Sequence, residues 1–307
     1  MDLLDRRLLI VGGKGGTGKS SVAAALGQLA ALSGKRTLVV AADGSPGAAG
    51  KFGVEPTYKP TIVERNLTVL RVDTRSSLDE FVALQLGPLR GISGPVAAAL
   101  GFVAEAAPGV AELLLVGKYA HEVRTKDWDL VVVDAASSGH LLGELAAPTG
   151  VNDLASVGRL ARETGWMVEL LGDPEITGVV NVTLAEEVPF VETLEFVSRL
   201  HVETPAHLGA VVVNRTRPQL YTRDGRAEVE SLIAAPPARM SKGAAGLLEG
   251  VQIGIDRADV ASEVDARLRR ELSEGTQLLH VPDLGVVPDT VVAIREALHD
   301  ELNAGSR

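Results

Sequence analysis

Short apolar runs recur along the chain, and the stretches between them carry helical patterns of apolar and polar positions. Seven of these runs are rich in Val, Ile and Leu: residues 7–11, 36–42, 67–72, 129–134, 178–183, 208–214 and 277–281. Because none alternates strictly between apolar and polar positions, we expect strands that are covered on both faces. The pattern therefore predicts an α/β fold, with a mostly parallel sheet of about seven strands and helices on both faces, in three layers.

The segments between the runs predict helices. Most gaps hold one helix, as at Lys19 to Leu32 and at Pro189 to Leu200, and a loop leads from the fourth run to a helix near Leu154 to Leu171. Residues 215–276 are polar at first and then weakly helical. The tail, residues 289–307, has apolar positions that predict a helix packed on the sheet.

Residues 74–128 are too many for a simple crossover between two strands. A βαβ unit needs only about 30 residues in all, whereas this segment holds roughly three helical patterns. We therefore expect a single domain over residues 1–307, with residues 74–128 inserted in it as a helical subdomain at the carboxyl edge of the sheet. A substrate would be held at that edge.

The amino-acid composition restricts the kinds of binding partner that we expect. The 307 residues include 40 Asp and Glu against 30 Lys and Arg, a net charge of −10, and no basic cluster. We therefore expect no nucleic-acid binding, which needs a positive surface. The longest apolar stretch, residues 94–117, is interrupted by Glu105, Pro108 and Glu112, which argues against stable membrane insertion. No signal-peptide core precedes the first run, so a cytoplasmic location is expected.

One short stretch carries a phosphate-binding motif. Gly13 to Ser20, GKGGTGKS, matches G-x-x-x-x-G-K-[ST] directly after a predicted strand and directly before a helix. The glycines let successive backbone N–H groups surround phosphate oxygens, and the helix N-terminus adds partial positive charge. Lys19 is then placed to bridge the β- and γ-phosphates of ATP, and the Ser20 hydroxyl to bind Mg²⁺. A glycine-rich strand-to-helix turn without a ligand is the alternative.

Lys14 is a second lysine in the same loop. A side chain of its length does not easily reach the phosphates that its own backbone surrounds. It therefore either points outward to another group or is a solvated surface lysine, and the loop pattern alone leaves both interpretations open.

The sequence KGGTGKS resembles the deviant phosphate loop K-G-G-x-G-K-[ST] of dimeric P-loop ATPases. These include the nitrogenase iron protein, the chromosome-partition and cell-division ATPases, and the arsenite-pump (anion-transporting) and tail-anchored-protein-targeting ATPases. The resemblance implies that Lys14 acts in trans on the nucleotide of a dimer partner, which is a second copy or a paralogue. It also implies ATP contacts from the whole loop: Gly13, Lys14, Gly15, Gly16, Thr17, Gly18, Lys19, Ser20 and Ser21.

A phosphate loop needs a second acid nearby to hold the Mg²⁺ shell. Asp134 stands where the apolar run LVVV ends, and we expect it to hold Mg²⁺ through water, beside Ser20. The sequence DAASSGH resembles D-[TA]-A-P-T-G-H, the second switch loop of the arsenite-pump and tail-anchored-targeting branch, with Ser137 in place of proline. His140 matches that pattern, either as a hydrogen-bonded structural residue or as a catalytic one.

Asp43 follows the second predicted strand, in the first switch region. The branch usually reads S-T-D-P-A-x-x-L there, and the resemblance implies that Asp43 orients the attacking water. Gly44, Ser45 and Gly47 depart from this pattern. A carboxylate that accepts a hydrogen bond from the water contributes acid–base catalysis. A turn aspartate in a glycine-rich loop is the alternative.

Two strand ends indicate where the base would bind. The segment PAHLGAVVVNR looks like the branch's strand that ends in an adenine-contacting Asn, and Asn214 has the donor and acceptor that such a contact needs. LLHVPDL resembles the V-P strand end that lines the base, which implies contacts from Val281 and Pro282. Residues 179–200 resemble the branch's V-T-L-P-E-x-x-P-x-x-E-T segment, so the resemblance covers most of the chain.

The chain has no cysteine, which excludes the cysteine-dependent sites of several of these relatives. An iron–sulfur cluster, a thiolate metalloid site and a shared C-x-x-C zinc all need cysteines. The tail, residues 289–307, is not a basic membrane helix of the cell-division type, and the net charge of −10 argues against a DNA-binding partition ATPase. The resemblance therefore implies a Mg-ATP hydrolase of the arsenite-pump and tail-anchored-targeting branch with an undefined protein or hydrophobic client. The apolar residues within 77–124 either pack on the sheet or face such a client in a closed dimer. The alternatives are a low-turnover nucleotide-binding scaffold, such as the regulatory half of a heterodimer, and a monomeric P-loop kinase.

Overall fold

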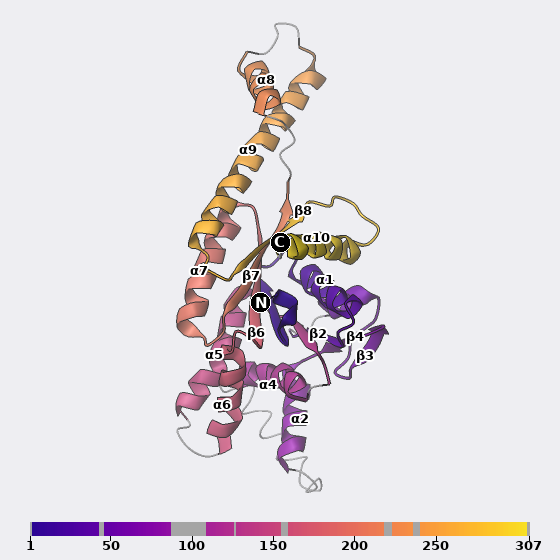
Figure 1. Cartoon of the computed structure of the whole chain (residues 1–307), viewed down its shortest axis with the longest axis vertical. Helices are drawn as coiled ribbons and strands as arrows, with labels where there is room; N and C mark the ends of the chain where they lie inside the picture. Colours follow the sequence, from indigo (N-terminus) through magenta and orange to yellow (C-terminus); the bar gives the residue numbers. More distant parts are fainter. Residues whose placement is uncertain are drawn as a thin grey trace.

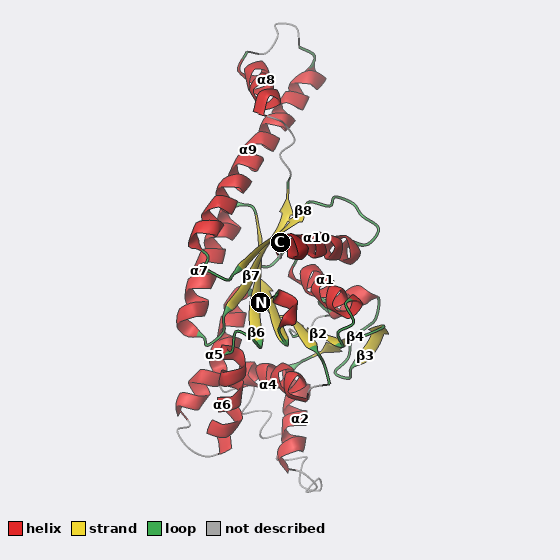
Figure 2. Cartoon of the chain, viewed as in Figure 1, coloured by secondary structure: helices red, strands yellow, loops and turns green. Residues whose placement is uncertain are grey.

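A computed structural model of the chain describes residues 2–42, 46–86, 109–125, 127–154, 159–217, 223–235 and 240–305 (Figure 1). Asp43, which the sequence predicts as the water-orienting residue, lies outside the described residues, and so do residues 87–108 of the expected helical subdomain. In the described part, a central sheet carries helices on both faces, and two further helices extend away from it as an arm (Figure 2).

The sheet of the described residues has eight strands. Their bounds are β1 Leu8–Gly13, β2 Thr37–Ala41, β3 Thr61–Glu64, β4 Leu67–Arg71, β5 Leu130–Asp134, β6 Thr177–Leu184, β7 Leu208–Thr216 and β8 Gln277–Pro282. They lie in the order β3-β4-β2-β5-β1-β6-β7-β8. Every one of the seven predicted runs is a strand, and these seven pair in parallel, which confirms the predicted α/β class.

Strand β3 was not predicted. It pairs antiparallel with β4 at one edge of the sheet, and its residues alternate between partly buried and exposed positions. The Ile62 side chain is 80% exposed. An edge strand of four residues that faces solvent leaves no continuous apolar run in the sequence, so the pattern that marks doubly covered strands does not find it.

Nine α-helices and two short 3₁₀ helices accompany the sheet in the described residues. Their bounds are α1 Lys19–Leu32, α2 Thr74–Leu86, α4 Val110–Thr125, α5 Ser138–Leu154, α6 Arg159–Gly172, α7 Glu187–Glu203, α8 Arg223–Ala234, α9 Lys242–Glu271, α10 Thr290–Gly305, η1 Leu3–Asp5 and η2 Ala49–Phe52. Helix α1 has the predicted bounds, and α6 and α7 contain most of their predicted spans.

Alternate residues of the central strands enter two different cores. Leu9 and Val11 of β1 pack in one core with residues of α1 and α10. Leu8 and Ile10 pack in the other, with residues of α4, α5, α6 and α7. Since successive side chains of a strand point to opposite faces, burial of both sets explains why the runs do not alternate.

Two stretches are more helical than predicted. The loop expected after β5 is instead α5, whose glycines and internal Pro148 are typical of loops. Leu141, Leu142 and Leu145 bury one side of this helix against the sheet, and that burial outweighs its poor helix propensity. The weakly helical region contains α8 and the 30-residue α9, whose N-terminus is capped by the Ser241 side chain.

The C-terminal helix lies where its apolar positions predict. Val291, Ile294, Leu298 and Leu302 of α10 are buried in the core shared with α1, and α10 also contacts β8. The prediction that the tail packs on the main body of the fold is confirmed.

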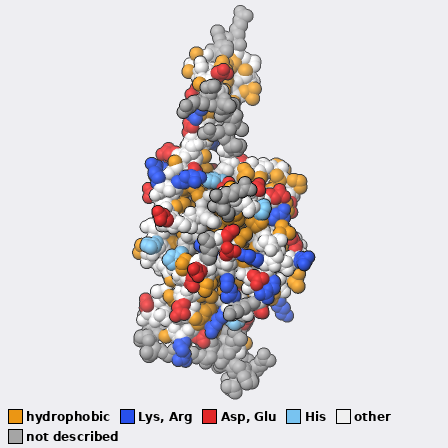
Figure 3. Space-filling model, viewed as in Figure 1, with side chains coloured by type: hydrophobic (Ala, Val, Ile, Leu, Met, Phe, Trp, Pro, Cys, Tyr) orange, Lys and Arg blue, Asp and Glu red, His pale blue; other side chains and the backbone are white. Residues whose placement is uncertain are grey.

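The surface of the body carries charges of both signs. On the face in Figure 3, Lys and Arg side chains are interspersed with Asp and Glu. The arm of α8 and α9 exposes larger apolar side chains, among them Leu232, Leu247 and Ile253. Among the described helices, none is both long enough and apolar enough to cross a membrane.

Candidate active site

The glycine-rich loop leaves β1 in the middle of the sheet and leads directly into α1. β1 pairs with β5 on one side and with β6 on the other, so the loop lies at the carboxyl edge of three adjacent strands. The backbone from Lys14 to Gly16 is exposed, and Lys19 and Ser20 form the first turn of α1. Exposed loop N–H groups beside a helix N-terminus form a site for phosphate oxygens.

Two glycines of the loop are required by close neighbours as well as by their backbone angles. Gly13 has a φ of +138°, and a Cβ there would lie 2.2 Å from the carbonyl oxygen of Val182 on β6. Gly18 has a φ of +98°, and its Cβ would lie 2.3 Å from the side-chain nitrogen of Asn214. A side chain at Gly13 would force the loop away from β6, and one at Gly18 would displace the Asn214 amide.

Asn214, at the end of β7, supports the loop from behind. Its side-chain amide donates to the carbonyl of Thr17 at 2.8 Å, and its amide oxygen accepts the N–H of Arg215 at 2.9 Å. The side chain is buried. The predicted contact with adenine is not tested by this geometry, but the structure gives Asn214 a second role, in holding the phosphate loop.

The other two predicted base contacts lie on the adjacent strand. Val281 and Pro282 end β8, which pairs with β7 so that Pro282 lies opposite Thr216. The Val281 side chain is buried in the core, and its carbonyl accepts the Thr216 hydroxyl at 3.2 Å. The strand ends that carry Asn214, Val281 and Pro282 therefore lie at one edge of the sheet, as the sequence predicts. The contact of these residues with a base remains a prediction.

Asp134 ends β5, next to the strand that carries the phosphate loop. It pairs in register with Val11 of β1 and with Ala41 of β2. Its carboxylate is buried and accepts the backbone N–H of Ala48 at 2.8 Å. Gly47, with a φ of +43°, makes room for it, because a Cβ there would lie 2.6 Å from the Asp134 carboxylate. The predicted Mg²⁺ acid is thus hydrogen-bonded to the first switch region.

Lys14 does not fold back over its own loop. Its side chain is 58% exposed and forms an ion pair with Glu192 on α7, which is 31% exposed. Sequence reasoning missed Glu192 as a site residue, although it is the glutamate of the P-x-x-E-T pattern in residues 179–200. It missed Ala48 as well, because a backbone N–H leaves no signal in the sequence.

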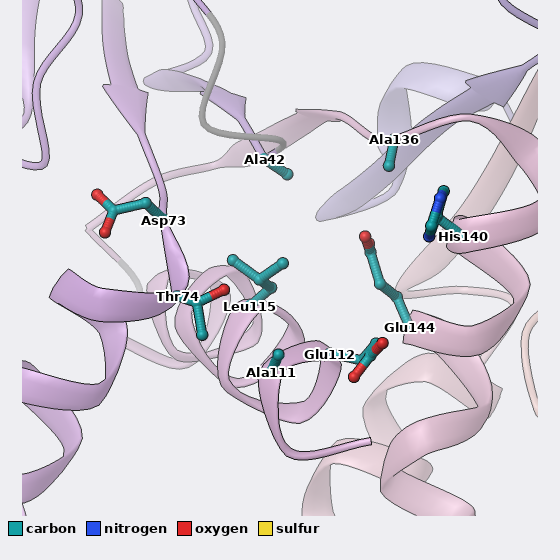
Figure 4. A pocket seen from close by; sticks show the side chains of 9 residues that line it. All are labelled: Ala42, Asp73, Thr74, Ala111, Glu112, Leu115, Ala136, His140 and Glu144. Atoms are coloured by element: carbon teal, nitrogen blue, oxygen red, sulfur yellow. The ribbon is translucent and has the colours of Figure 1, made fainter. Parts of the chain in front are cut away.

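A pocket of about 280 Å³ lies between the carboxyl ends of β2 and β5 and the helices α2, α4 and α5 (Figure 4). Its lining residues are Ala42, Asp73, Thr74, Ala111, Glu112, Leu115, Ala136, His140 and Glu144. Ala42 directly follows β2 and Ala136 lies two residues after the end of β5, so the pocket borders both switch regions. The exposed His140 ring makes no hydrogen bond with the described residues, which gives no support to a hydrogen-bonded structural role.

The lining of this pocket is acidic. Glu112 and Glu144 contribute carboxylates, whereas the Asp73 carboxylate accepts the backbone N–H and the hydroxyl of Ser76 at the start of α2. Burial, with the charge of Glu144 added to it, raises the pKa of the nearby Tyr119 phenol well above its ordinary value. Because negative charge repels phosphate, this pocket is a poor site for the phosphates of a nucleotide.

A glycine-rich loop between a central parallel strand and a helix, with an acid at the end of the neighbouring strand, defines a P-loop nucleoside triphosphatase. The family model described as Anion-transporting ATPase matches residues 6–167. The chain belongs to this family and is an ATPase, with ATP as its substrate.

Several relatives extend the match beyond that region. The ATPase BagA of Mycobacterium tuberculosis is 32% identical over 302 residues, which cover 91% of this chain and 86% of the relative. A putative arsenical pump-driving ATPase of Halobacterium salinarum is 28% identical over 235 residues, 71% of this chain and 36% of the relative. An ATPase ASNA1 homolog of Entamoeba dispar is 25% identical over 252 residues, 68% of this chain and 76% of the relative.

Proposed function

We propose that the chain is a dimeric Mg-ATP hydrolase whose ATP-driven dimer closure is coupled to the handling or targeting of a protein or hydrophobic client. The observation that supports this most is the position of Lys14. It lies in the phosphate loop, yet its side chain is exposed and pairs with α7 instead of with the loop. A lysine that faces away from its own phosphate site is available to the nucleotide of a second subunit.

The residues around the loop fit Mg-ATP. The loop backbone from Gly13 to Ser21, which is exposed at Lys14 to Gly16, would bind the phosphates, and Lys19 would bridge the β- and γ-phosphates. The Ser20 hydroxyl and the Asp134 carboxylate are hard oxygen ligands, which Mg²⁺ prefers, and the pairing of β1 with β5 brings them to the same edge of the sheet. Mg²⁺, when bound, neutralises charge on the phosphate oxygens, with Asp134 holding it through water.

Two residues would act on the γ-phosphate during hydrolysis. Lys14 from the second subunit would stabilise the charge of the transition state, as a cationic group supplied in trans does in other P-loop enzymes. Asp43 would accept a hydrogen bond from the attacking water and orient it. Asn214, Val281 and Pro282 would contact the base.

The client would be held by the helical subdomain, residues 74–128, at the carboxyl edge of the sheet. Helix α4 of this segment lines the pocket beside both switch regions, so a change in the switches would reach it directly. Helix α2 exposes the aromatic side chain of Phe81. Because the chain has no cysteine, an apolar client fits this segment better than a thiolate-bound metalloid does.

The test combines assembly and turnover. Light scattering should give a dimer in the presence of Mg-ATP and a monomer with ADP for the Asp43→Asn variant, which hydrolyses ATP slowly. Lys14→Ala should bind ATP with little change but lose turnover by about 10²-fold or more, since a stabilising charge in the transition state is removed. Lys59→Ala, which removes an exposed lysine away from the loop, is the control.

Two results would contradict the proposal. A Lys14→Ala variant with wild-type turnover would remove the role in trans. Wild-type protein that binds ATP but does not hydrolyse it would favour a nucleotide-binding scaffold instead.

A further inference from the structure

Glu192, on α7, binds Lys14, the lysine that the proposed function assigns to the nucleotide of a second subunit. Its Oε1 accepts from the Lys14 ammonium, and the two residues are 178 positions apart in the sequence. Both side chains reach solvent, with 58% of Lys14 and 31% of Glu192 exposed. The pair can therefore open without unfolding any element.

The position of Glu192 is fixed by a buried polar network at the start of α7. The next residue, Thr193, accepts the side-chain amide of Asn181 at 3.2 Å and donates to the carbonyl of Pro189 at 2.8 Å. Thr183 donates to the same carbonyl at 3.2 Å. The side chains of Asn181, Thr183 and Thr193 are all buried, so this end of α7 is held rigidly on β6.

Lys14 is positioned by the same strand. Gly13, the residue before it, pairs with Val182 of β6, which lies between the two network residues Asn181 and Thr183. The loop and the start of α7 therefore share one support, and the carboxylate of Glu192 is presented to Lys14 by that support. Two flexible surface side chains that met by chance would not both be attached to the same strand in this way.

The Lys14 ammonium cannot bind the Glu192 carboxylate and the phosphates of a partner's nucleotide equally strongly at the same time. An exposed ion pair is weak, because water screens it, whereas the phosphates of a nucleotide offer several negative charges at once. We propose that Glu192 is a positioning residue that holds Lys14 on its own subunit and releases it when the Mg-ATP of a second copy of this chain arrives. This inference rests on the proposed role of Lys14 in trans.

Two consequences follow for dimer closure. Each subunit must break one Lys14–Glu192 pair before its lysine reaches the partner's phosphates, so the pair opposes closure. The carboxylate of Glu192 also adds negative charge beside the place where those phosphates arrive. Removing that charge should therefore make the ATP-bound dimer form at a lower protein concentration.

The experiment measures ATP turnover per subunit as a function of protein concentration. For Glu192→Gln we expect the concentration at half-maximal turnover to fall by about threefold to thirtyfold, because a symmetrical dimer opens two exposed ion pairs. Glu195→Gln is the matched control: it removes the same charge from an exposed position one turn further along α7, where no contact with Lys14 exists among the described residues. The control should keep the wild-type midpoint.

Three outcomes would overturn the inference. These are an unchanged or higher midpoint in Glu192→Gln, an equal shift in Glu195→Gln, and a lower plateau of turnover at an unchanged midpoint. The last would mean that Glu192 orients Lys14 within the closed dimer. A thermal melt of each variant checks that α7 remains folded.

A double variant separates this inference from the proposed function. If Lys14 acts in trans, Lys14→Ala abolishes most turnover. In that background Glu192→Gln should lower the ATP-dependent dimer midpoint, measured by light scattering, less than it does beside an intact Lys14, because only the repulsion of the phosphates is then removed. If Lys14→Ala leaves turnover intact, the proposed function fails. If Lys14→Ala is inactive and Glu192→Gln behaves like Glu195→Gln, only the role of Glu192 fails.

Discussion

The side chain of Asn214, on β7, donates a hydrogen bond of 2.8 Å to the carbonyl of Thr17, in a phosphate loop 197 residues earlier in the chain. The amide fills the space that Gly18 leaves by having no Cβ. The last strands of the sheet therefore help to hold the loop that the first strand carries. A change at Asn214 should reach the phosphate site even without any contact between Asn214 and the base.

Asn214→Asp should weaken nucleotide binding through this contact. The substitution keeps the shape of the side chain but replaces the donor with a carboxylate oxygen that repels the Thr17 carbonyl. A buried acceptor that loses its donor costs about 1–3 kcal/mol, so we expect the affinity for a non-hydrolysable ATP analogue to fall by about tenfold, as measured by calorimetry.

A comparison of bases separates the two roles of Asn214. If it mainly holds the loop, the affinities for the ATP and GTP analogues should fall together, whereas a role in reading adenine would be seen as lost discrimination between them. Asn66→Asp is the control, because the Asn66 amide also donates to a backbone carbonyl, that of Ala31, at 3.3 Å and away from the loop. Equal losses in both variants would contradict a specific role.

Lys118→Met should destabilise the contact between α2 and α4. The Lys118 side chain is 8% exposed and pairs with Glu80 at 2.9 Å and with Glu122 at 2.8 Å. Burial works to raise the pKa of the Glu80 carboxyl, but hydrogen bonds from Tyr58 and Lys118 outweigh it and hold that pKa below its ordinary value. Removing the cation leaves two shielded carboxylates together, so we expect the free energy of unfolding to fall by about 2–3 kcal/mol.

The control for this prediction is a second ion pair on α2. Arg75 and Asp79 are 3.9 Å apart, four residues apart in the sequence, and largely exposed. Arg75→Met should change the free energy of unfolding by less than about 0.5 kcal/mol, because water screens such pairs. Urea denaturation of both variants measures the difference. Similar losses would show that burial of the Lys118 cluster contributes nothing beyond an ordinary surface pair.

Much of the fold could be predicted because its strands and first helix are specified locally. A run buried on both faces is apolar throughout, and α1 follows a motif that fixes where it begins. Helix α5 was not predicted because Pro148 and the glycines of this segment are local signals for a loop. The segment is nevertheless helical because Leu141 and Leu145 are buried against a strand far away in the sequence. Tertiary packing therefore outweighs the low intrinsic helix propensity of this segment.

The features of the site also divide into those that a local sequence pattern predicts and those that it does not. The phosphate loop is a continuous motif, and the position of Asp134 beside it could be predicted because strand ends meet at one edge of a parallel sheet. The contacts of Glu192 with Lys14 and of Ala48 with Asp134 join segments that no local pattern connects. They depend on the order of the strands, which the sequence pattern alone does not specify.

Asp129→Asn should lower stability in a pH-dependent way. The Arg36 guanidinium donates to Asp129 at 2.7 and 3.1 Å, and these hydrogen bonds, with a further one from the Arg36 backbone, lower the pKa of the carboxyl to about 2. Since the unfolded chain has an ordinary aspartate pKa of about 3.9, ionised Asp129 stabilises the fold above about pH 4. That contribution is lost as the pH falls toward 2.

The difference in unfolding free energy between wild type and Asp129→Asn should therefore be constant near neutral pH and shrink below about pH 4. It should be small throughout, because the pair is exposed to solvent. Urea denaturation at a series of pH values measures it, with the exposed neighbour Asp127 changed to Asn as the control. A difference that persists unchanged down to pH 2 would contradict the assignment.

Gly47→Ala should reduce ATP turnover by displacing Asp134. Gly47 has a φ of +43°, and its Cβ would lie 2.6 Å from the Asp134 carboxylate, which accepts the Ala48 N–H in the structure. Gly53→Ala is a matched control, because Gly53 has a φ of +72° and nothing within 4 Å of the added Cβ. Both variants carry a similar backbone cost of about 1–2 kcal/mol, and Gly47→Ala adds the cost of the clash, so its melting temperature should fall further. Only Gly47→Ala should need more Mg²⁺ for half-maximal turnover. If the two variants show the same Mg²⁺ dependence, the position of Asp134 does not control the metal site.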